Sequence, residues 1–407
     1  MPEVKPDINL VSGEFWGADP HTALTWLREN EPIYWDERGK VWGISKYEHI
    51  REISVNPDRF SSAGGIRPDV PAVPMMIDMD DPEHRYRRRL VSRGFTPNRV
   101  RDQEAKVRAV VDHLIDRICE RGECDFVWDL AAWLPLIMIG EALGFAEEDY
   151  ETLLGWSDDM LTFLGNSDPE KLERAMLAIS EYTEYIEKVI AGRREAPGDD
   201  LISILVQADI NGDQLDPENL IFESLLILIG GDETTRHVIS GGCYQLLSNR
   251  DQWNQLCDDP TRIPRAVEEM LRWVSPIKNM ARTVVRDIEF HGKRLHEGDK
   301  VVLLYPSANR DEAVFSDPFR FDINRHPNEH MAFGFGNHFC LGNSLARLEL
   351  RVMFEQLTAR LPDLQLIDEN EPTNRPANFV SGYEHLTVKF TPSSPTSYCD
   401  SNSETVL

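Results

Sequence analysis

The amino-acid sequence predicts a mainly α-helical protein with small β-sheets, built as one large domain. Residues 20–276 read as a succession of helices. After residue 276, short segments of alternating, β-branched residues appear, which are typical of strands. No linker rich in proline, glycine or serine and no internal repeat divides the 407 residues. We expect an N-terminal segment at 1–18, one domain at 19–391 and a disordered polar tail at 392–407.

The elements of this domain are predicted from apolar spacing and from helix start and stop signals. Apolar residues at helical spacing predict a helix over 101–121, with Gly122 as its stop, and another over 169–194. Asp216 as N-cap and Pro217 in the first turn begin a nearly all-apolar helix; if unbroken to about residue 249, it is about 50 Å long. The remaining elements are expected as strands at 281–290, 300–305 and 385–390 and a helix at 341–361.

Composition and charge exclude several classes of protein. With 70 acidic against 43 basic residues the formal net charge is −27, and such a chain repels nucleic-acid phosphates and anionic lipid heads. No apolar run approaches the roughly 20 residues of a membrane span, and no signal-peptide pattern is present. The six cysteines form no C-x-x-C pair or zinc pattern. We therefore expect a cytoplasmic protein with reduced cysteines, no nucleic-acid partner and no stable membrane insertion.

The predicted long helix contains a local conflict at residues 230–235, Gly-Gly-Asp-Glu-Thr-Thr. Two adjacent glycines cost about 1 kcal/mol each in a helix interior, and burying an acid beside a hydroxyl is expensive. Such a conflict favours a functional site in which a ligand lies against the glycines while the acid and the alcohol move protons. A capped kink in the helix is the structural alternative.

A second unusual segment surrounds Cys340. The cysteine follows the glycine-rich turn Phe333-Gly334-Phe335-Gly336 and directly precedes a predicted helix. Free backbone N–H groups and the positive end of a helix dipole favour a thiolate at such a position, and a thiolate can be a nucleophile or a metal ligand. The glycines of the turn, together with Gly342, would let the backbone pass close to a flat partner.

Three motifs together resemble the cytochrome P450 family. The pattern F-x-x-G-x-x-x-C-x-G, which ends at Gly342, is similar to the family's haem-binding loop. Upstream, Glu269-Met270-Leu271-Arg272 is similar to its E-x-x-R helix, and residues 230–235 are similar to its oxygen-activating helix. The motifs occur in the family's order and separations, and the resemblance covers about 19–391. It implies the cytochrome P450 fold, haem b as cofactor and monooxygenase chemistry with O2.

The resemblance also implies a role for each matching residue. Cys340 would be the metal ligand, an axial thiolate on the haem iron. Glu233 and Thr234 would relay protons to bound O2, for which Gly230 would make room. Glu269 and Arg272 would form a structural ion pair. The other implied cofactor-binding residues are Phe333, Gly336 and Gly342 in the loop, and His84, Arg88, Arg282 and His338 at the haem propionates.

The resemblance further implies two protein partners, a ferredoxin and a ferredoxin reductase, because bacterial members of the family receive electrons from them. Arg85, Arg89 and Arg93 repeat every four residues, one helical step from His84 and Arg88. An acidic ferredoxin could dock on this basic stripe. A solvated helix face is the alternative.

Variable segments point to a substrate class. Stretches such as A-G-G-I-R-P-D, P-M-M-I-D-M-D-D-P and R-P-A-N-F-V-S-G are similar to those of actinobacterial cytochromes that oxidise the side-chain terminus of cholesterol and cholest-4-en-3-one. The resemblance implies hydroxylation of the terminal (C26/C27) methyl, with further oxidation left open. An apolar, methionine-rich lining suits such a ligand. The residues expected to line the substrate pocket are Met75, Ile77, Leu226, Ile229, Ile277, Met280, Phe379 and Val380.

Three alternatives stay open from the sequence. Within the family, the substrate could instead be a branched fatty acid, a terpene or a polyketide. A hydrolase with Cys340 as nucleophile and His338 as base would be colourless, and it would leave the conflict at 230–235 unexplained. A non-catalytic haem or lipid carrier would need neither Glu233 nor Thr234.

Overall fold

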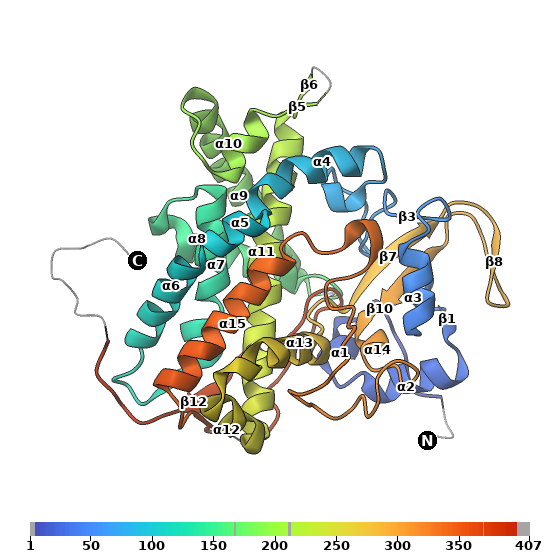
Figure 1. Cartoon of the computed structure of the whole chain (residues 1–407). Helices are drawn as coiled ribbons and strands as arrows, with labels where there is room; N and C mark the ends of the chain where they lie inside the picture. The colour runs from blue at the N-terminus through green and yellow to red at the C-terminus, as the bar shows by residue number, and fades with distance from the viewer. Residues whose placement is uncertain (1–4, 167, 211–212, 369, 397–407) are drawn as a thin grey trace.

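The computed structural model describes residues 5–166, 168–210, 213–368 and 370–396 and combines a large helical region with a smaller sheet region (Figure 1). The strands of the main sheet gather on the right of Figure 1, and most of the longer helices lie to the left and in the centre. The long helix α11, Pro217–Ser248, runs through the middle of the molecule beside α15, Asn343–Arg360. The predicted fold class, mainly α with small sheets, is confirmed.

The helices agree with the predicted ones in part. The predicted helix over 169–194 is α9, Pro169–Glu195. The predicted helix over 101–121 is two separate helices in the structure. The second of them ends at Asp116, so the chain has already turned before it reaches Gly122, which has a φ of +77°. The other α-helices are α1 (Gly13–Gly17), α2 (His21–Asn30), α3 (Tyr47–Ser54), α4 (Glu83–Val91), α5 (Pro97–Asp102), α6 (Glu104–Asp116), α7 (Trp133–Leu143), α8 (Tyr150–Thr162), α10 (Leu201–Val206), α12 (Arg250–Asp258), α13 (Ile263–Val274) and α14 (Tyr305–Ala308).

The main sheet has five strands in the order β1-β2-β10-β7-β3. Strand β10 pairs in parallel with β2 and antiparallel with β7. Because side chains alternate along a strand, Met280 and Arg282 on β7 share one face. The strands of this sheet are β1 (Ile33–Asp36), β2 (Val41–Ile44), β3 (Phe60–Ser61), β7 (Asn279–Val284) and β10 (Lys300–Leu304). The smaller sheets contain β4 (Glu123–Asp125), β5 (Asp209–Ile210), β6 (Asp213–Gln214), β8 (Ile288–Phe290), β9 (Lys293–Leu295), β11 (Gln365–Leu366) and β12 (Thr387–Lys389).

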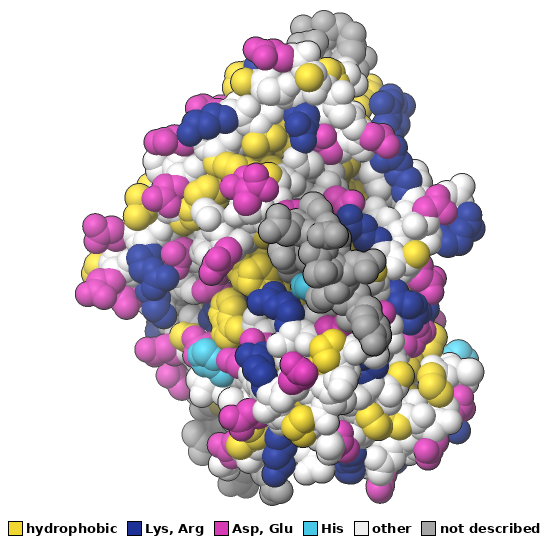
Figure 2. Space-filling view, turned by 90° about the vertical axis from the view of Figure 1, so that its left-hand side faces the viewer, with side chains coloured by type: hydrophobic (Ala, Val, Ile, Leu, Met, Phe, Trp, Pro, Cys, Tyr) yellow, Lys and Arg dark blue, Asp and Glu magenta, His cyan; other side chains and the backbone are white. Residues whose placement is uncertain are grey.

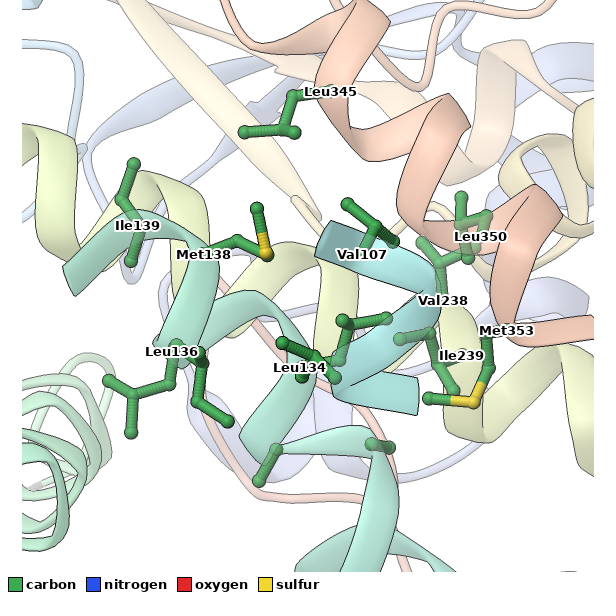
Figure 3. Close-up of a cluster of buried hydrophobic side chains, with 14 of the residues drawn as sticks. Val107, Leu134, Leu136, Met138, Ile139, Val238, Ile239, Leu345, Leu350 and Met353 are labelled. Atoms are coloured by element: carbon green, nitrogen blue, oxygen red, sulfur yellow. The ribbon is translucent and has the colours of Figure 1, made fainter. Parts of the chain in front are cut away.

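The main hydrophobic core lies where four helices meet around the centre of α11 (Figure 3). A Cβ atom at Gly242 of α11 would lie 2.8 Å from the sulfur of Met270, so glycine allows α13 to pack closely there. The labelled core side chains in Figure 3 are Val107 from α6, Leu134, Leu136, Met138 and Ile139 from α7, Val238 and Ile239 from α11, and Leu345, Leu350 and Met353 from α15.

Both segments predicted to flank the domain contact it. Leu10 and Trp16 are buried against the main sheet, in a cluster with Leu304. At the other end, the amide of Ser393 donates to the carbonyl oxygen of Cys119 over 2.9 Å. The remainder of the predicted tail, 397–407, lies outside the described residues.

On the face shown in Figure 2, acidic and basic side chains are interspersed, so the net charge of −27 is not gathered there into one acidic patch. None of the described helices is long and apolar enough to cross a bilayer.

Candidate active site

A cavity lies where the middle of α11 faces the segment before α15. Its wall is mostly apolar and also includes residues of α4 and β7. Among the described residues, no three His, Cys, Asp or Glu side chains are arranged to hold a metal ion, so a metal here would depend on a lone cysteine ligand. The polar side chains on the wall are His84, Arg88, Thr234, Thr235, Tyr305, His338, Cys340 and Glu349.

Cys340 borders this cavity three residues before the start of α15. Its carbonyl oxygen accepts from Asn343 Nδ2 over 2.8 Å, which fixes the turn into the helix. Burial raises the pKa of the Cys340 thiol, and the N–H groups of Gly342 and Asn343 and the Arg88 guanidinium only partly oppose this effect. The N–H groups at the start of α15 therefore favour the thiolate, as expected, but burial outweighs them. A cation bound at the sulfur would supply the missing stabilisation.

The loop that carries Cys340 is held by α13. Glu268 accepts from Arg347 Nε over 2.7 Å and from Arg347 Nη2 over 3.0 Å, and its Oε2 lies 3.0 Å from His330 Nε2. Burial alone would raise the pKa of Glu268, but these two partners lower it to about 2. The Arg347 guanidinium also lies 4.5 Å from the centre of the Phe333 ring. One carboxylate on α13 thus ties α15 to the start of the loop, at His330.

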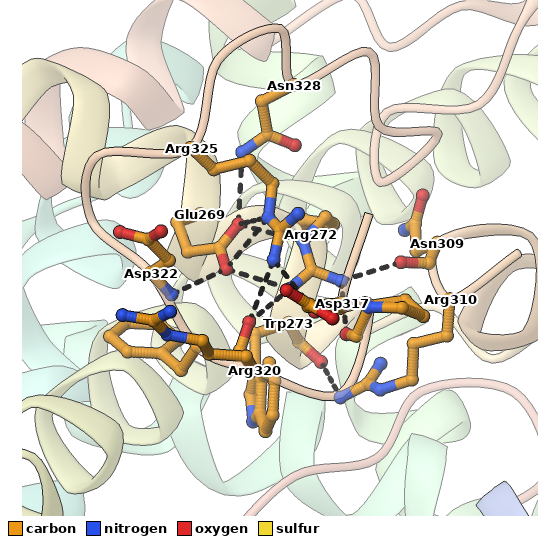
Figure 4. A network of polar contacts seen from close by, with 12 residues as sticks. Glu269, Arg272, Trp273, Asn309, Arg310, Asp317, Arg320, Asp322, Arg325 and Asn328 are labelled. Carbon is orange, nitrogen blue, oxygen red and sulfur yellow. Dashed lines mark hydrogen bonds and ion pairs between the residues drawn. The ribbon is translucent and has the colours of Figure 1, made fainter. Parts of the chain in front are cut away.

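The predicted ion pair of Glu269 and Arg272 is present on α13 (Figure 4). Arg272 Nε and Nη2 each donate to Glu269 over 2.8 Å, and Arg325 Nε donates to the same carboxylate over 3.1 Å. The amide of Asp322 and the Asn328 side chain complete the shell of Glu269, at 2.9 and 3.2 Å. Neither residue borders the cavity, so the network supports the site from outside.

Basic side chains lie at one edge of the cavity. The rings of His84 and His338 have centroids 4.1 Å apart. Burial lowers the pKa of both imidazoles, that of His338 to about 2 with help from Arg282, His84 and Arg88. Arg282 is only 3% exposed, and neither it nor Arg88 forms an ion pair with any described residue. A buried guanidinium without a carboxylate is costly, so this edge fits an anionic ligand. Arg282 itself lies behind the wall rather than on it.

The two glycines on α11 have different environments. Helix α11 is continuous over 32 residues, so the capped-kink alternative is wrong. A Cβ atom at Gly231 would lie 2.6 Å from Cγ1 of Ile139, so this glycine permits packing on α7. A Cβ atom at Gly230 would meet no atom of the described residues within 4 Å, so this glycine widens the cavity. One turn on, Thr234 borders the cavity, and its Oγ1 donates to the carbonyl oxygen of Gly230 over 2.9 Å.

Glu233 does not border the cavity, unlike Thr234 beside it. Its carboxylate is fully buried against Arg236, with which it forms an ion pair, and lies 3.2 Å from His237 Nε2 and 3.5 Å from Arg375 Nη1. Burial alone would raise the pKa of Glu233, but the two guanidinium groups hold it below its ordinary value. Asp158 is paired with both arginines behind this cluster. The structure therefore separates the predicted acid from the predicted alcohol.

The predicted substrate residues divide into two groups. Ile77, Leu226, Ile277 and Met280 lie on the cavity wall. The structure does not place Met75, Ile229, Phe379 or Val380 on the wall. Instead, Met75 faces the helical core, while Ile229, Phe379 and Val380 pack beside Ile277 and Met280 in a second layer. Of the predicted cofactor residues, Gly336 also lies off the wall, and a Cβ atom there would meet the carbonyl oxygen of Ser54 at 2.3 Å.

Several wall residues are absent from the sequence prediction, among them Met76, Ile227, Tyr305 and Glu349. The short 3-10 turn at Met76–Asp78 rotates Met76 rather than Met75 toward the cavity. Helical spacing could have found Ile227, which lies four residues before Gly231. No sequence signal marks Glu349 or Tyr305, because their burial depends on how α15 and the strand before α14 pack.

Comparisons with known proteins agree with this geometry. A family model described as Cytochrome P450 matches residues 263–389. A steroid C26-monooxygenase from Mycobacterium tuberculosis (strain ATCC 25618 / H37Rv) is 52% identical over 393 residues, which cover 96% of this chain and 98% of the relative. A steroid C26-monooxygenase from Mycolicibacterium smegmatis is 51% identical over the same shares. The crystal structure of CYP109E1 from Bacillus megaterium in complex with testosterone has a TM-score of 0.86 and 33% identity and covers 93% of this chain and 99% of that one. This chain therefore belongs to the cytochrome P450 family.

Proposed function

We propose that this cytochrome P450 monooxygenase hydroxylates the terminal methyl of the side chain of cholesterol or cholest-4-en-3-one. The observation that carries the proposal is the identity of 51–52%, over nearly the whole chain, to two proteins named steroid C26-monooxygenase. The cavity supports it, because Met76 and Met280 contribute adaptable apolar side chains to a wall suited to a hydrophobic ligand.

The cofactor of the enzyme is haem b, and the residues around the cavity fit it. Cys340 would supply the sulfur ligand of the iron, and Gly230 leaves space beside α11. Arg88 and Arg282 lack carboxylate partners among the described residues, so the two haem propionates would provide the anions that these guanidinium groups lack. His84 and His338, which also border the cavity, would donate hydrogen bonds to the same propionates. When bound, haem supplies oxygen activation and insertion, and its thiolate ligand favours O–O cleavage.

Thr234 would hold a proton at the cavity wall, with Glu233 behind it. The Thr234 hydroxyl now donates to Gly230, and a rotation about χ1 would turn it toward the cavity. Glu233 would exchange protons with this hydroxyl only after Arg236 or Arg375 releases its carboxylate. The proposed relay is therefore gated by an ion-pair cluster.

The regioselectivity of the reaction would come from position. A terminal methyl has a stronger C–H bond than the neighbouring tertiary carbon, so the wall must present the chain end and cover the weaker bond. Met76 and Ile77 come from the loop before α4, and Met280 comes from β7. These side chains would close around the substrate chain from two elements.

The electron donors are proposed to be a cytoplasmic ferredoxin and its reductase. Arg85, Arg89 and Arg93 are exposed on and just after α4, the helix that also carries Arg88 at the cavity edge. Arg85 pairs with Asp81 over 2.7 Å, whereas no ion pair is found for Arg89 among the described residues. An acidic partner docked here would lie close to the cofactor edge.

Titration and product analysis test the proposed function. The ferric enzyme is titrated with cholest-4-en-3-one, and a saturable blue shift of the Soret band is expected as the steroid displaces iron-bound water. Turnover should then give the side-chain terminal alcohol, and mass spectrometry of longer reactions shows whether oxidation continues to the acid. Hydroxylation at the tertiary carbon or on the rings would overturn the proposal. A spectrum that shifts only with branched fatty acids or terpenes would favour the alternative substrate classes.

A further inference from the structure

We infer that Asp78 is a positioning residue for the selectivity of this enzyme, because its carboxylate fixes the loop that carries Met76 and Ile77 into the cavity wall. The inference rests on the proposed function, and it names the residue that sets the wall on one side of the substrate chain. Asp78 follows Ile77 directly, does not border the cavity and is 4% exposed.

The Asp78 carboxylate joins three points of the loop. Its Oδ1 accepts from the amide of Ile66 over 2.8 Å. Its Oδ2 accepts from the amide of Val73 over 3.0 Å and from Arg67 Nη2 over 3.2 Å. Bonds to a carboxylate are stronger than neutral ones, and a side chain with these partners has little freedom to move. Asp78 thus closes segment 66–73 onto the turn that presents Met76 and Ile77.

The same loop is anchored to the main sheet. The amide of Ala281 on β7 donates to the carbonyl oxygen of Ile66 over 2.6 Å. Lys300 at the start of β10 donates to the carbonyl oxygen of Gly65 over 2.9 Å. Ile66 is therefore fixed on one side by β7 and on the other by Asp78. The Asp78 carboxylate therefore connects the main sheet, through Ile66, to the turn that forms part of the cavity wall.

The turn itself depends on this anchor. Met76–Asp78 is a single 3-10 turn, in which the amide of Asp78 donates to the carbonyl oxygen of Met75 over 3.0 Å. A turn this short has almost no hydrogen bonds of its own to hold it. If Asp78 loses its contacts, a small rotation could exchange Met75 and Met76 at the wall. The reacting carbon would then shift relative to the oxidant, and a misplacement of about 1 Å can cost on the order of a hundredfold in rate.

The test replaces Asp78 by asparagine in the holoenzyme. Asp78→Asn keeps the size of the side chain and one hydrogen-bond acceptor. Its NH2 group, however, faces a backbone N–H group from which the carboxylate accepts a hydrogen bond in the wild type. We expect the ratio of terminal to tertiary hydroxylation to fall by about tenfold, with faster amide exchange at Ile66 and Val73 by hydrogen-exchange mass spectrometry. Arg67→Gln removes one of the three contacts and should give a smaller change of the same sign. Asp58→Asn makes the same chemical change at an exposed residue outside the loop and should leave both readouts unchanged.

Each outcome separates this inference from the proposed function. Faster exchange with an unchanged product ratio would show that Asp78 only stabilises the loop, which overturns the inference. Unchanged exchange would overturn it as well. If the wild-type enzyme makes no terminal product, the proposed function fails instead. The inference then stands or falls on whether Asp78→Asn shifts the site of oxidation on the substrate that is turned over. Should Asp78→Asn fail to fold, Arg67→Gln carries the same test.

Discussion

Two buried glutamates in this protein have arginine partners at similar positions along the sequence but have different surroundings. Glu269 on α13 pairs with an arginine three residues on, Arg272, and with a distant second one, Arg325. Glu233 on α11 likewise pairs with Arg236, three residues on, and with the distant Arg375. All four arginines are mostly or fully buried. The pairing pattern alone therefore does not distinguish the two clusters.

Hydrogen-bond satisfaction does distinguish them. Arg272 donates to Glu269 and to the carbonyl oxygens of Asn309 and Pro318, at 2.8 and 2.9 Å, so its guanidinium is fully used (Figure 4). Arg236, by contrast, has no hydrogen-bond partner for Nε or Nη1 among the described residues, and it stands behind the cavity. A fully paired buried network is rigid, whereas a partly paired one has donors free for a second arrangement. We conclude that the Glu269 cluster holds the fold and that the Glu233 cluster is able to rearrange.

The largest effect is expected at Glu269. Glu269→Gln leaves Arg272 and Arg325 buried without their anion, and breaking such a pair costs about 3–5 kcal/mol. The free energy of unfolding, measured by urea titration of the holoenzyme, should fall by that amount, with loss of haem on gentle heating. A loss below about 1 kcal/mol would mean that the carbonyl contacts, not the carboxylate, hold Arg272.

A smaller loss of stability but a larger loss of function is expected at Glu233. In Glu233→Gln the arginines keep Asp158, so the free energy of unfolding should fall by about 1–2 kcal/mol. A residue that supplies protons contributes roughly a hundredfold or more to its step, so hydroxylated product per O2 consumed should drop sharply while peroxide rises. Oxygen consumption and product are measured together, with Thr234→Ala as the matched variant. Full coupling in Glu233→Gln would remove this residue from the relay.

The contrast between the two clusters shows which features of this protein can be predicted from its sequence. The fold class, the Cys340 loop and the Glu269–Arg272 pair were predictable, because each depends on local spacing or on a motif. The surroundings of Glu233 were not, since Arg375 lies 142 residues away and the tertiary packing brings it there. Likewise, the choice of Met76 over Met75 depends on a single 3-10 turn that no apolar pattern marks. Helical spacing predicts which face of α11 is buried, but not which of its buried residues borders a cavity.

A third buried glutamate differs from Glu269 and Glu233, because burial raises its pKa. Glu223 on α11 has one cation, Arg87 Nη1 at 3.1 Å, and burial raises its pKa to about 7, against the Arg87 guanidinium and the Met76 amide. The folded protein then binds a proton that the unfolded chain releases between about pH 4.5 and pH 7, so this contribution to stability is present at low pH and is lost as the pH rises through about 7. The free energy of unfolding should fall by about 1–3 kcal/mol over this interval. Glu223→Gln should flatten the dependence; an equally steep curve in the variant would assign it to another group.

The smallest effect on stability is expected at an exposed charged residue, where a substitution instead changes the rate of encounter with a partner. Arg89 lies on the outer face of α4, where side-chain charge contributes within about 0.5 kcal/mol to stability. Charge at a docking surface acts instead on the rate of encounter, and salt screens it beyond about 10 Å at 0.1 M. Arg89→Glu should therefore leave urea unfolding unchanged but slow reduction by a ferredoxin several-fold at low ionic strength, with the difference shrinking as salt is added.

Arg294→Glu makes the same charge change on β9, on an exposed side chain of the small β8–β9 hairpin, and serves as the control. Equal slowing in both variants would assign the effect to net charge rather than to a docking site, and no slowing in either would leave α4 a solvated helix. A slowing confined to Arg89→Glu would place the electron donor on the outer side of α4, whereas Arg88 of the same helix borders the cavity.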